Sequence, residues 1–389
     1  MKKKKICVLT ATRAEFGLLR PIIEKMQKKE MLDVKIVAIG MHLSAEFGMT
    51  YKEIEEAGFA IDRKIDTLLS GDSTAAVAKS MGMTMISFAD YFAETKPDYL
   101  FAIADRYETL AVCTAAMCER IPIIHYMGGE TSEGAIDECI RHSISKMSSL
   151  HFCCTETYRN RIIQLGEQPD KVFNVGSTGV ENIKSLRLLS EKEIRDYLGL
   201  CDDEKYVIGT FHPVTLEEDS AEEQIHHLLD VCAKQKDTVF VFTKSNADAM
   251  GRIVNANLEM YAERFSNIKL FDSLGNLRYL SALKYAEYVI GNSSSGLLEV
   301  PSFKIPTVNI GDRQGGRERA KSVIDCDASE EGIAQAIEKA RSKEFVDFIR
   351  DAVNPYEKDA TSTEIVRILC DAVRQGPIDL KKKFYNLKV

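Results

Sequence analysis

Short apolar runs rich in β-branched residues alternate with longer helical patterns along almost all of this chain. Such alternation is typical of α/β proteins, in which helices cover both faces of a parallel sheet. The predicted strands fall into two successive series: Lys5–Ala11, Val34–Ile39, Tyr99–Ala104, Pro122–Tyr126, Leu150–Cys154 and Val172–Val175, then Tyr206–Phe211, Thr238–Phe242, Ile268–Phe271, Tyr288–Ile290 and Thr307–Ile310. The pattern therefore predicts two doubly wound, Rossmann-like domains in tandem.

A polar, helix-rich stretch, Thr178–Asp202, separates the two series, and 389 residues exceed what one ordinary core holds. We expect an N-terminal domain over residues 1–185 and a C-terminal domain over residues 186–360. The remaining segment, 361–389, contains an amphipathic helix that we expect to pack back on the first domain. Because open α/β sheets bind ligands beyond the carboxyl ends of their strands, a cleft between the domains is the predicted site.

Composition and charge argue against several classes of function. A net charge of −8 is unfavourable for binding nucleic acid, and no apolar run approaches the roughly 18 residues of a membrane span. The basic run Lys2–Lys5 precedes too short an apolar stretch for a signal peptide. The ten cysteines include no Cys-x-x-Cys pair, which indicates reduced thiols in a cytoplasmic protein. No residues have metal-ligand spacing, so we expect neither a metal nor a cofactor.

Polar side chains follow the predicted strands of the first domain. The positions are Arg13, His42, Asp105 with Arg106, Glu130 after two glycines, and Asp137 seven residues later. Three carboxylates after adjacent strands could share a pocket and raise one another's pKa values, which makes proton donors near neutral pH. Simpler roles remain open: Arg13 as a surface residue instead of a phosphate clamp, His42 as a structural histidine, and Asp105 as a helix cap.

The second domain carries residues suited to an anion. His212 follows the first strand of this domain, and Asn246 lies in a polar loop after the second. The segment Ile290–Glu299 is predicted to be a strand, a tight Ser-rich turn and a helix start, whose free amides and dipole favour a phosphate. A serine-capped helix without a ligand is the alternative. Without a G-x-G-x-x-G or Walker motif, a dinucleotide or ATP-hydrolysing function is poorly supported.

A Gly-rich loop with two arginines, Gly311–Glu318, follows the last predicted strand and suits a diphosphate. Within this domain we regard Ser293, Ser294, Gly296 and Arg313 as candidate diphosphate contacts. Glu299 could accept the hydroxyls of a ribose, with a surface glutamate as the alternative.

Taken together and in order, these segments resemble the hydrolysing UDP-N-acetylglucosamine 2-epimerases, especially the bacterial sialic-acid-pathway type. The segments are Arg13–Gly17, Gly40–His42, Gly128–Glu130, Asp137–Glu138, Ile140–Ile144, Phe211–Pro213, Gly291–Gly296 and Gly311–Gln314. The resemblance spans nearly the whole chain and is specific as a set, although no single segment would be.

The resemblance implies a glycosyltransferase-B-like fold assembled into homodimers or homotetramers, and a UDP-sugar as substrate. The family converts UDP-N-acetylglucosamine and water into N-acetylmannosamine and UDP, the first step of sialic acid biosynthesis. UDP is first eliminated in the anti sense to give 2-acetamidoglucal, and hydration then inverts carbon 2. No metal is required if arginine, histidine and helix amides take the diphosphate charge.

By resemblance, Asp105, Glu130 and Asp137 are the acid/base carboxylates, and His212 stabilises the departing diphosphate. The implied substrate contacts are Arg13, His42, Arg106, Asn246, Ser293, Ser294, Gly296, Glu299 and Arg313. Two positions depart from the pattern of the family. Leu18 stands where non-hydrolysing relatives have a lysine, and Ala104 stands where a glycine usually precedes the aspartate. The extra methyl group of Ala104 bears on the placement of Asp105.

Three alternatives remain open. The first is the same reaction on UDP-2,4-diacetamido-2,4,6-trideoxyglucose, which belongs to legionaminic acid biosynthesis. The second is a true glycosyltransferase on the same fold, which would turn over only with an acceptor. The third is a regulatory module that binds nucleotide sugars without catalysis.

Overall fold

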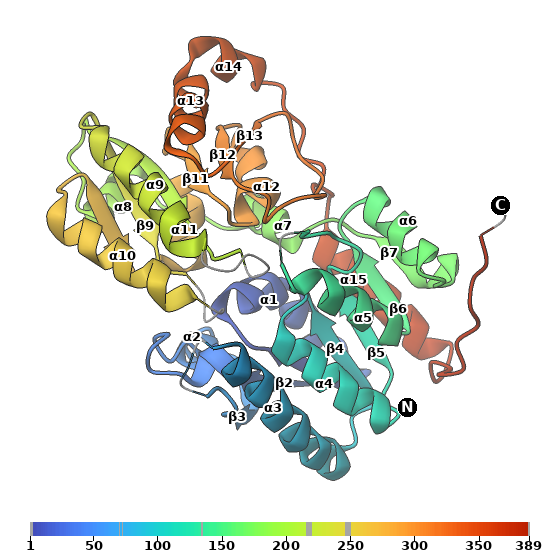
Figure 1. The fold of residues 1–389 in the computed structure, drawn as a ribbon. Helices are drawn as coiled ribbons and strands as arrows, with labels where there is room; N and C mark the ends of the chain where they lie inside the picture. The colour runs from blue at the N-terminus through green and yellow to red at the C-terminus, as the bar shows by residue number, and fades with distance from the viewer. Residues whose placement is uncertain are drawn as a thin grey trace. The chain divides into compact units, whose positions relative to one another are not determined.

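The computed structural model describes residues 3–69, 71, 73–133, 135–214, 220–245 and 250–387 (Figure 1). The chain divides into two compact units. Unit 1 contains Met1–Glu130, Asp137–Glu181 and Lys358–Val389, and unit 2 contains Thr131–Ile136 and Asn182–Glu357. Each unit has a parallel sheet with helices on both faces, so the predicted fold class, two Rossmann-like α/β domains, is confirmed.

The sheet of unit 1 has seven parallel strands in the order β3-β2-β1-β4-β5-β6-β7. Their bounds are β1 (Lys4–Thr10), β2 (Leu32–Ile39), β3 (Ile61–Ile65), β4 (Tyr99–Ile103), β5 (Ile123–Tyr126), β6 (Leu150–Cys153) and β7 (Val172–Asn174). The six predicted strands are present, but the prediction missed β3. This edge strand reads Ile-Asp-Arg-Lys-Ile and its charged middle is exposed, so it lacks the apolar run of a buried strand.

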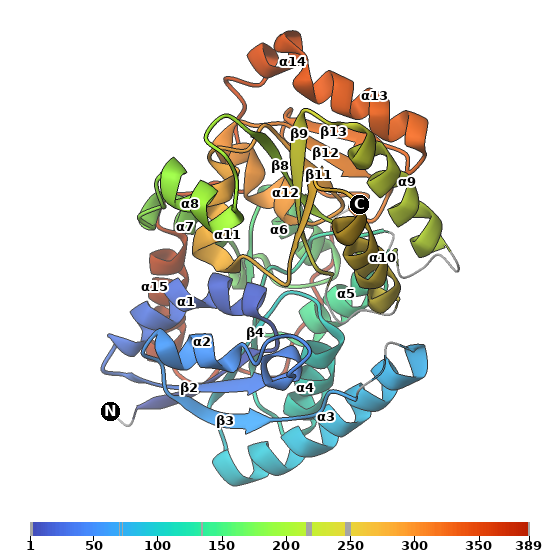
Figure 2. The same cartoon turned by 90° about the vertical axis from the view of Figure 1, so that its left-hand side faces the viewer.

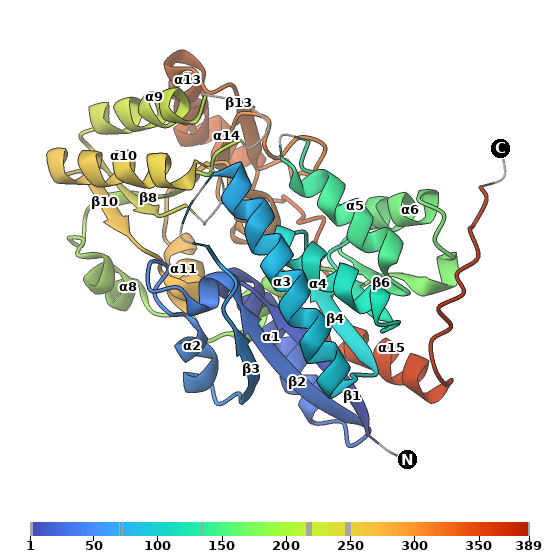
Figure 3. The ribbon, with the colours of Figure 1, turned by 60° about the horizontal axis from the view of Figure 1, so that its bottom comes forward.

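The helices of unit 1 lie on both faces of its sheet. They are α1 (Arg13–Gln27), α2 (Tyr51–Glu56), α3 (Thr74–Thr95), α4 (Tyr107–Cys118), α5 (Asp137–Met147), α6 (Glu156–Gln164) and α15 (Thr361–Arg374), with short 3-10 turns η1 (Gly40–Leu43) and η2 (Pro169–Lys171). Figure 3 shows α3, α4 and α5 side by side on one face. On the other face α15 packs against α1 (Figure 2). Helix α7 (Thr178–Ser185) carries the chain from unit 1 into unit 2.

The sheet of unit 2 has six parallel strands in the order β10-β9-β8-β11-β12-β13. Their bounds are β8 (Lys205–Thr210), β9 (Thr238–Thr243), β10 (Ile268–Phe271), β11 (Val289–Gly291), β12 (Thr307–Ile310) and β13 (Val323–Cys326). The five predicted strands are present. The prediction missed β13, which is again an edge strand and is only partly buried.

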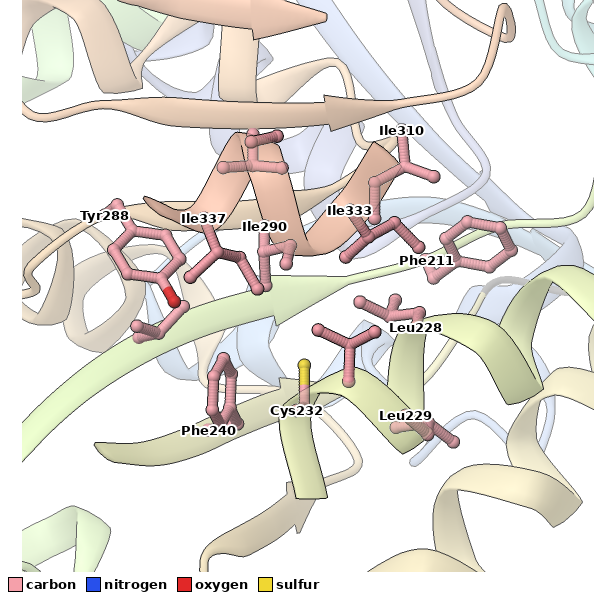
Figure 4. Close-up of a cluster of buried hydrophobic side chains, with 14 of the residues drawn as sticks. Phe211, Leu228, Leu229, Cys232, Phe240, Tyr288, Ile290, Ile310, Ile333 and Ile337 are labelled. Carbon is pink, nitrogen blue, oxygen red and sulfur yellow. The ribbon is translucent and has the colours of Figure 1, made fainter. Parts of the chain in front are cut away.

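The helices of unit 2 are α8 (Glu191–Leu198), α9 (Ser220–Lys234), α10 (Gly251–Arg264), α11 (Gly275–Leu283), α12 (Ser295–Leu298), α13 (Glu330–Arg341) and α14 (Lys343–Phe348), with a 3-10 turn η3 (Val300–Phe303). Figure 4 shows the core between the sheet and helices α9 and α13, where Cys232, Ile290 and Ile333 are completely buried. Helices α8 and α11 cover the opposite face. Because the strands are parallel, the residues that follow them lie at the same edge of the sheet.

Candidate functional site

His42 lies in the interior of unit 1, at the end of β2. Its Nε2 is 2.9 Å from Thr10 Oγ1 and its Nδ1 is 2.8 Å from Thr50 Oγ1. The ring is fully buried, and this burial lowers the pKa of His42 to about 4. The ring is therefore neutral at neutral pH, and both nitrogens are engaged by threonine hydroxyls, which is the geometry of a structural histidine.

Arg13 is the first residue of α1, where Thr12 caps the helix and forms a capping box with Glu15. The guanidinium Nη1 of Arg13 lies 3.1 Å from Glu53 Oε1 in a partly exposed ion pair. Pairs of this kind contribute about 0–1 kcal/mol, so exchanging Glu53 for a phosphate would cost little.

A completely buried arginine gathers three acidic segments of unit 1. Arg141, on α5, forms an ion pair with Asp105 through Nη2. Its Nη1 lies 2.9 Å from Glu138 Oε2 and donates to the carbonyl oxygen of Glu130 at 3.0 Å. Through Arg141, the residues that follow β4 and β5 are thus linked to the first turn of α5. The sequence analysis included Arg141 in the matched segment Ile140–Ile144 but gave it no role, although Glu138 and Arg141 have the i,i+3 spacing of a helical ion pair.

The backbone conformation at the end of β4 shows why a glycine usually stands at the position of Ala104. Ala104 has a φ of +58°, in the left-handed region, and its carbonyl oxygen is 2.8 Å from His125 Nε2. A glycine adopts this conformation without strain, whereas an alanine pays roughly 1–2 kcal/mol. Asp105, the next residue, is therefore aimed at Arg141 from a strained turn.

Glu130 is almost completely buried and follows a turn that requires glycine. A Cβ on Gly129, whose φ is +78°, would lie 2.4 Å from the carbonyl oxygen of Tyr158. The side chain of Glu130 lies near the Cys154 thiol, whose pKa is raised by burial and by the carboxylate. Asp137, half-buried, opens α5. The structure thus brings Asp105 and Glu130 together around Arg141, with Asp137 in the turn that carries Glu138.

Arg106 joins a second group of buried acids at the same edge. Its Nε lies 3.0 Å from Oε2 of Glu108, which is 1% exposed. Nearby, burial raises the pKa of Glu15 to about 7, although Arg106 acts in the opposite direction. Sequence reasoning missed Glu15 and Glu108 because both occupy the first turns of helices, where acidic residues are usually surface groups.

His212, at the exit of β8, is held by the side chain of Asn292. Asn292 Oδ1 accepts from the backbone N–H of His212 at 2.7 Å, and Asn292 Nδ2 donates to the His212 carbonyl at 2.7 Å. The Nδ1 of His212 is 3.0 Å from Ser245 Oγ. A Cβ on Gly291 would lie 2.0 Å from the Thr210 carbonyl, so glycine allows β8 and β11 to end this close together.

The Ser-rich turn after β11 leads into a shorter helix than the sequence suggested. Helix α12 contains four residues and Glu299 is its C-cap, because Pro301 cannot continue the hydrogen-bond ladder. The helix dipole at Ser293 and Ser294 is correspondingly small, and an anion there would depend on hydroxyls and backbone amides. Gly296 packs against Thr307, whose Oγ1 donates to the Gly296 carbonyl at 2.8 Å.

The Gly-rich loop closes over this turn. Arg313 Nη1 and Gln314 Nε2 donate to the carbonyl oxygen of Asn292 at 3.2 and 2.8 Å. Within the described residues, Arg313 has no acidic partner, so its charge is available to an anion. Asn246, the remaining candidate contact, lies outside the described residues.

The described part of the chain offers no obvious place for a metal ion or a membrane crossing. Among its His, Cys, Asp and Glu side chains, no group of three or more is arranged to hold a metal. No helix in the same ranges combines the length and apolar character needed to cross a bilayer.

Comparison with known proteins gives consistent matches. The family model described as UDP-N-acetylglucosamine 2-epimerase matches residues 24–370. The chain is 44% identical over 346 residues to the Campylobacter jejuni GDP/UDP-N,N'-diacetylbacillosamine 2-epimerase (hydrolyzing), covering 89% of each protein. It is 37% identical to the Escherichia coli polysialic acid biosynthesis protein P7, covering 99% of this chain and 98% of that protein.

A solved structure extends the likeness to the fold. The Neisseria meningitidis UDP-GlcNAc 2-epimerase bound to UDP-GlcNAc matches with a TM-score of 0.80 and 18% identity, covering 94% of this chain and 100% of that one.

Proposed function

Since this chain belongs to the UDP-N-acetylglucosamine 2-epimerase family, we propose that it hydrolyses a UDP-activated 2-acetamido sugar with inversion at carbon 2. In the first step a base removes the carbon-2 proton, the bond from carbon 1 to the diphosphate oxygen breaks, and UDP leaves. The product of this elimination is a 2-acetamidoglucal. Water then adds its oxygen to carbon 1 while a proton returns to the opposite face of carbon 2. The observation that carries this proposal is the 44% identity to a hydrolysing relative over 89% of each chain.

The favoured substrate is UDP-2,4-diacetamido-2,4,6-trideoxyglucose, that is, UDP-N,N'-diacetylbacillosamine. The name of the 44% identical relative gives this sugar as its GDP or UDP derivative. This is the alternative that we connected with legionaminic acid biosynthesis. The second candidate is UDP-N-acetylglucosamine, which would give N-acetylmannosamine for sialic acid biosynthesis. The 37% identity to a polysialic acid biosynthesis protein favours this second candidate.

We assign the proton chemistry to unit 1. Asp105, Glu130 and Asp137 are the proposed acid/base carboxylates, because an elimination followed by hydration needs more than one titratable group. The contacts of Arg141 with Asp105 and with the Glu130 backbone support this assignment. The buried guanidinium places a fixed positive charge beside Asp105.

We assign the leaving group to unit 2. His212, Arg313 and the turn with Ser293, Ser294 and Gly296 are proposed to hold the diphosphate, and Glu299 the ribose. Arg313 supports this assignment because it has no acidic partner among the described residues, and a fixed cation stabilises the charge that develops on UDP. Arg13 and Arg106 remain proposed substrate contacts, each of which would have to exchange a carboxylate partner for the substrate.

The test is an incubation in deuterated water with each of the two UDP-sugars, followed by NMR. We expect UDP and a free 2-epimerised sugar carrying deuterium at carbon 2, with faster turnover of the diacetamido substrate. UDP-N-acetylmannosamine as the final product, or hydrogen retained at carbon 2, would contradict the hydrolysing mechanism. Faster turnover of UDP-N-acetylglucosamine would identify the second candidate.

The same assay separates the other two classes of function. A glycosyltransferase would release UDP efficiently only with an added acceptor. A binding module would bind UDP without turnover, and Asp105→Asn or Glu130→Gln would then change nothing. For the proposed enzyme, each of these substitutions should lower kcat by about 10²–10⁴-fold.

We also propose that the protein assembles as a homodimer or homotetramer. Helix α3 and the end of α4 leave the apolar side chains of Met83, Ile86 and Met117 exposed, which is costly on an isolated subunit. Light scattering should give two or four times the mass of the chain, and Ile86→Glu should lower it if this surface is buried between subunits.

A further inference from the structure

Two of the proposed acid/base residues flank a segment that belongs to the other unit. Glu130 and Asp137 are part of unit 1, whereas the residues between them, Thr131–Ile136, are part of unit 2. Thr131, Ser132 and Ala135 are each more than nine-tenths buried. Of the described residues between the two carboxylates, these three are therefore packed into unit 2, whereas Glu133 and Ile136 are exposed.

The segment contacts the glycine pair of the Gly-rich loop. Arg317 Nε donates to the Thr131 carbonyl at 2.9 Å, and the Glu133 N–H donates to the Gly315 carbonyl at 3.4 Å. A Cβ on Gly316 would lie 2.5 Å from Thr131 Oγ1, and one on Gly315 would lie 2.9 Å from Glu133 Oε2. Both positions are glycines, and the segment occupies the space that a side chain would need.

The residues just before the glycine pair make the contacts of the proposed diphosphate site. Arg313 and Gln314 both donate to the carbonyl oxygen of Asn292, whose side chain holds the backbone of His212. One short turn, residues 313–317, therefore contacts the proposed leaving-group residues on one side and Thr131 and Glu133 on the other. All of these contacts lie within unit 2.

From these contacts we propose that residues 131–133 form a positioning element that makes the placement of Glu130 depend on the bound diphosphate. When Arg313 binds the diphosphate, the turn at residues 315–317 is held in one position. Through its contacts, this turn then holds Thr131 and Glu133. The peptide bond from Thr131 to Glu130 passes this placement to the carboxylate of Glu130. The inference rests on the proposed function, and it makes Thr131 and Gly316 positioning residues.

The experiment compares two glycine substitutions with the same backbone strain. Gly316→Ala places a methyl group against Thr131 at a φ of +73°, whereas Gly275→Ala, at the start of α11, adds one at a φ of +68° where no atom lies within 4 Å. We expect Gly316→Ala to lower kcat by about 10²-fold, as a displacement of about 1 Å can, with the Kd for UDP changed less than about threefold. Gly275→Ala should leave both quantities within about threefold of the wild type.

A second variant tests whether contact with Thr131 is the cause. Adding Thr131→Ala to Gly316→Ala removes the hydroxyl from the clash and should restore most of kcat. Equal losses in the two glycine variants, a parallel loss of UDP affinity in Gly316→Ala, or no rescue by Thr131→Ala would each overturn the proposal.

A readout without turnover separates this inference from the proposed function. Amide hydrogen exchange at residues 131–133 should slow when UDP is added to the wild type and to Gly275→Ala, but not to Gly316→Ala. This measurement tests whether UDP binding is coupled to the segment that begins at Thr131, even if neither UDP-sugar is a substrate. Unchanged exchange in the wild type with saturating UDP would overturn the proposal, while turnover in the NMR assay would leave the proposed function standing.

Discussion

The two units arrange their polar residues in different ways. In unit 1, charged side chains at the carboxyl edge of the sheet are paired with one another, as Arg141 is with Asp105 and Glu138. In unit 2 the corresponding network consists of neutral groups, Asn292 and Ser245 around His212, and the described residues offer Arg313 no carboxylate. The first arrangement balances charge internally and suits proton transfer. The second leaves a positive charge for an incoming anion.

The contrast predicts that breaking the ionic network of unit 1 has the largest effect on stability. Arg141→Met leaves Asp105 and Glu138 without their buried partner and should lower the free energy of unfolding by about 3–5 kcal/mol. Urea-induced unfolding followed by circular dichroism measures this. Arg367→Met is the control, because Arg367 forms exposed ion pairs on α15 that contribute about 0–1 kcal/mol. Similar losses of unfolding free energy in the two variants would show that the Arg141 network stabilises the protein no more than exposed ion pairs do.

The buried neutral histidines of unit 1 should make its stability depend on pH. The pKa of His42 is about 4 when folded against roughly 6.5 when unfolded, so the unfolded chain binds a proton that the folded chain does not. The contribution of His42 is complete above about pH 6.5 and decreases as the pH falls towards 4, by about 3 kcal/mol in total.

The matched variant for this prediction is His42→Gln. Its stability should fall less than that of the wild type between pH 6.5 and 4, in unfolding curves measured at each pH. The difference between the two proteins isolates His42 from Glu15, whose raised pKa of about 7 acts in the opposite direction as the pH falls. Parallel pH dependences would contradict a neutral, buried His42.

Removing the amide that holds His212 should have an intermediate effect, confined to unit 2. Asn292→Ala leaves the N–H and the carbonyl of His212 without partners, which costs about 1–3 kcal/mol, and should weaken UDP binding by about tenfold. Titration calorimetry with UDP measures the second effect. Asn257→Ala, at another buried amide on α10, should lower stability without changing UDP affinity. Equal affinities for UDP in these two variants would argue against a role for Asn292 in placing His212.

The smallest expected effect concerns the strained turn of unit 1. Ala104→Gly relieves the left-handed conformation but adds freedom to the unfolded chain, so the protein should become more stable by roughly 0.5 kcal/mol. Ala102→Gly, in the extended part of the same strand, should instead destabilise by about 1 kcal/mol. Thermal unfolding would show opposite shifts of Tm. A lower Tm for Ala104→Gly would mean that contacts of the methyl group outweigh its backbone strain.

The fold and part of the site were predictable because both depend on local patterns. Apolar runs marked eleven of the strands, and polar residues directly after them, such as Asp105, Glu130 and His212, lie at strand exits as expected. The missed strands β3 and β13 are edge strands, whose half-exposed sequences do not differ from loops. The methyl group of Ala104 was noticed in the sequence, but its left-handed φ required the structure.

The remaining features depend on contacts between distant residues. Arg141 lies one position after Ile140 on an amphipathic helix, where a surface arginine is the ordinary expectation, and its burial follows from Asp105 some 36 residues earlier. The place of Thr131–Ile136 in unit 2 follows from Gly315 and Arg317, about 180 residues later. Local sequence patterns therefore predict neither the burial of Arg141 nor the assignment of Thr131–Ile136 to unit 2.

The chain leaves unit 1 after Glu181 and returns at Lys358, and helix α15 then packs against α1. Glu181 accepts from both the N–H and the Oγ of Ser362, and Lys25 contacts both residues. During synthesis, one face of α1 therefore remains uncovered until α15 is made, some 180 residues after the rest of unit 1. A truncated chain that ends before α15 would expose this apolar face, so we expect the shortened protein to aggregate in the cell even though its entire seven-stranded sheet has been made.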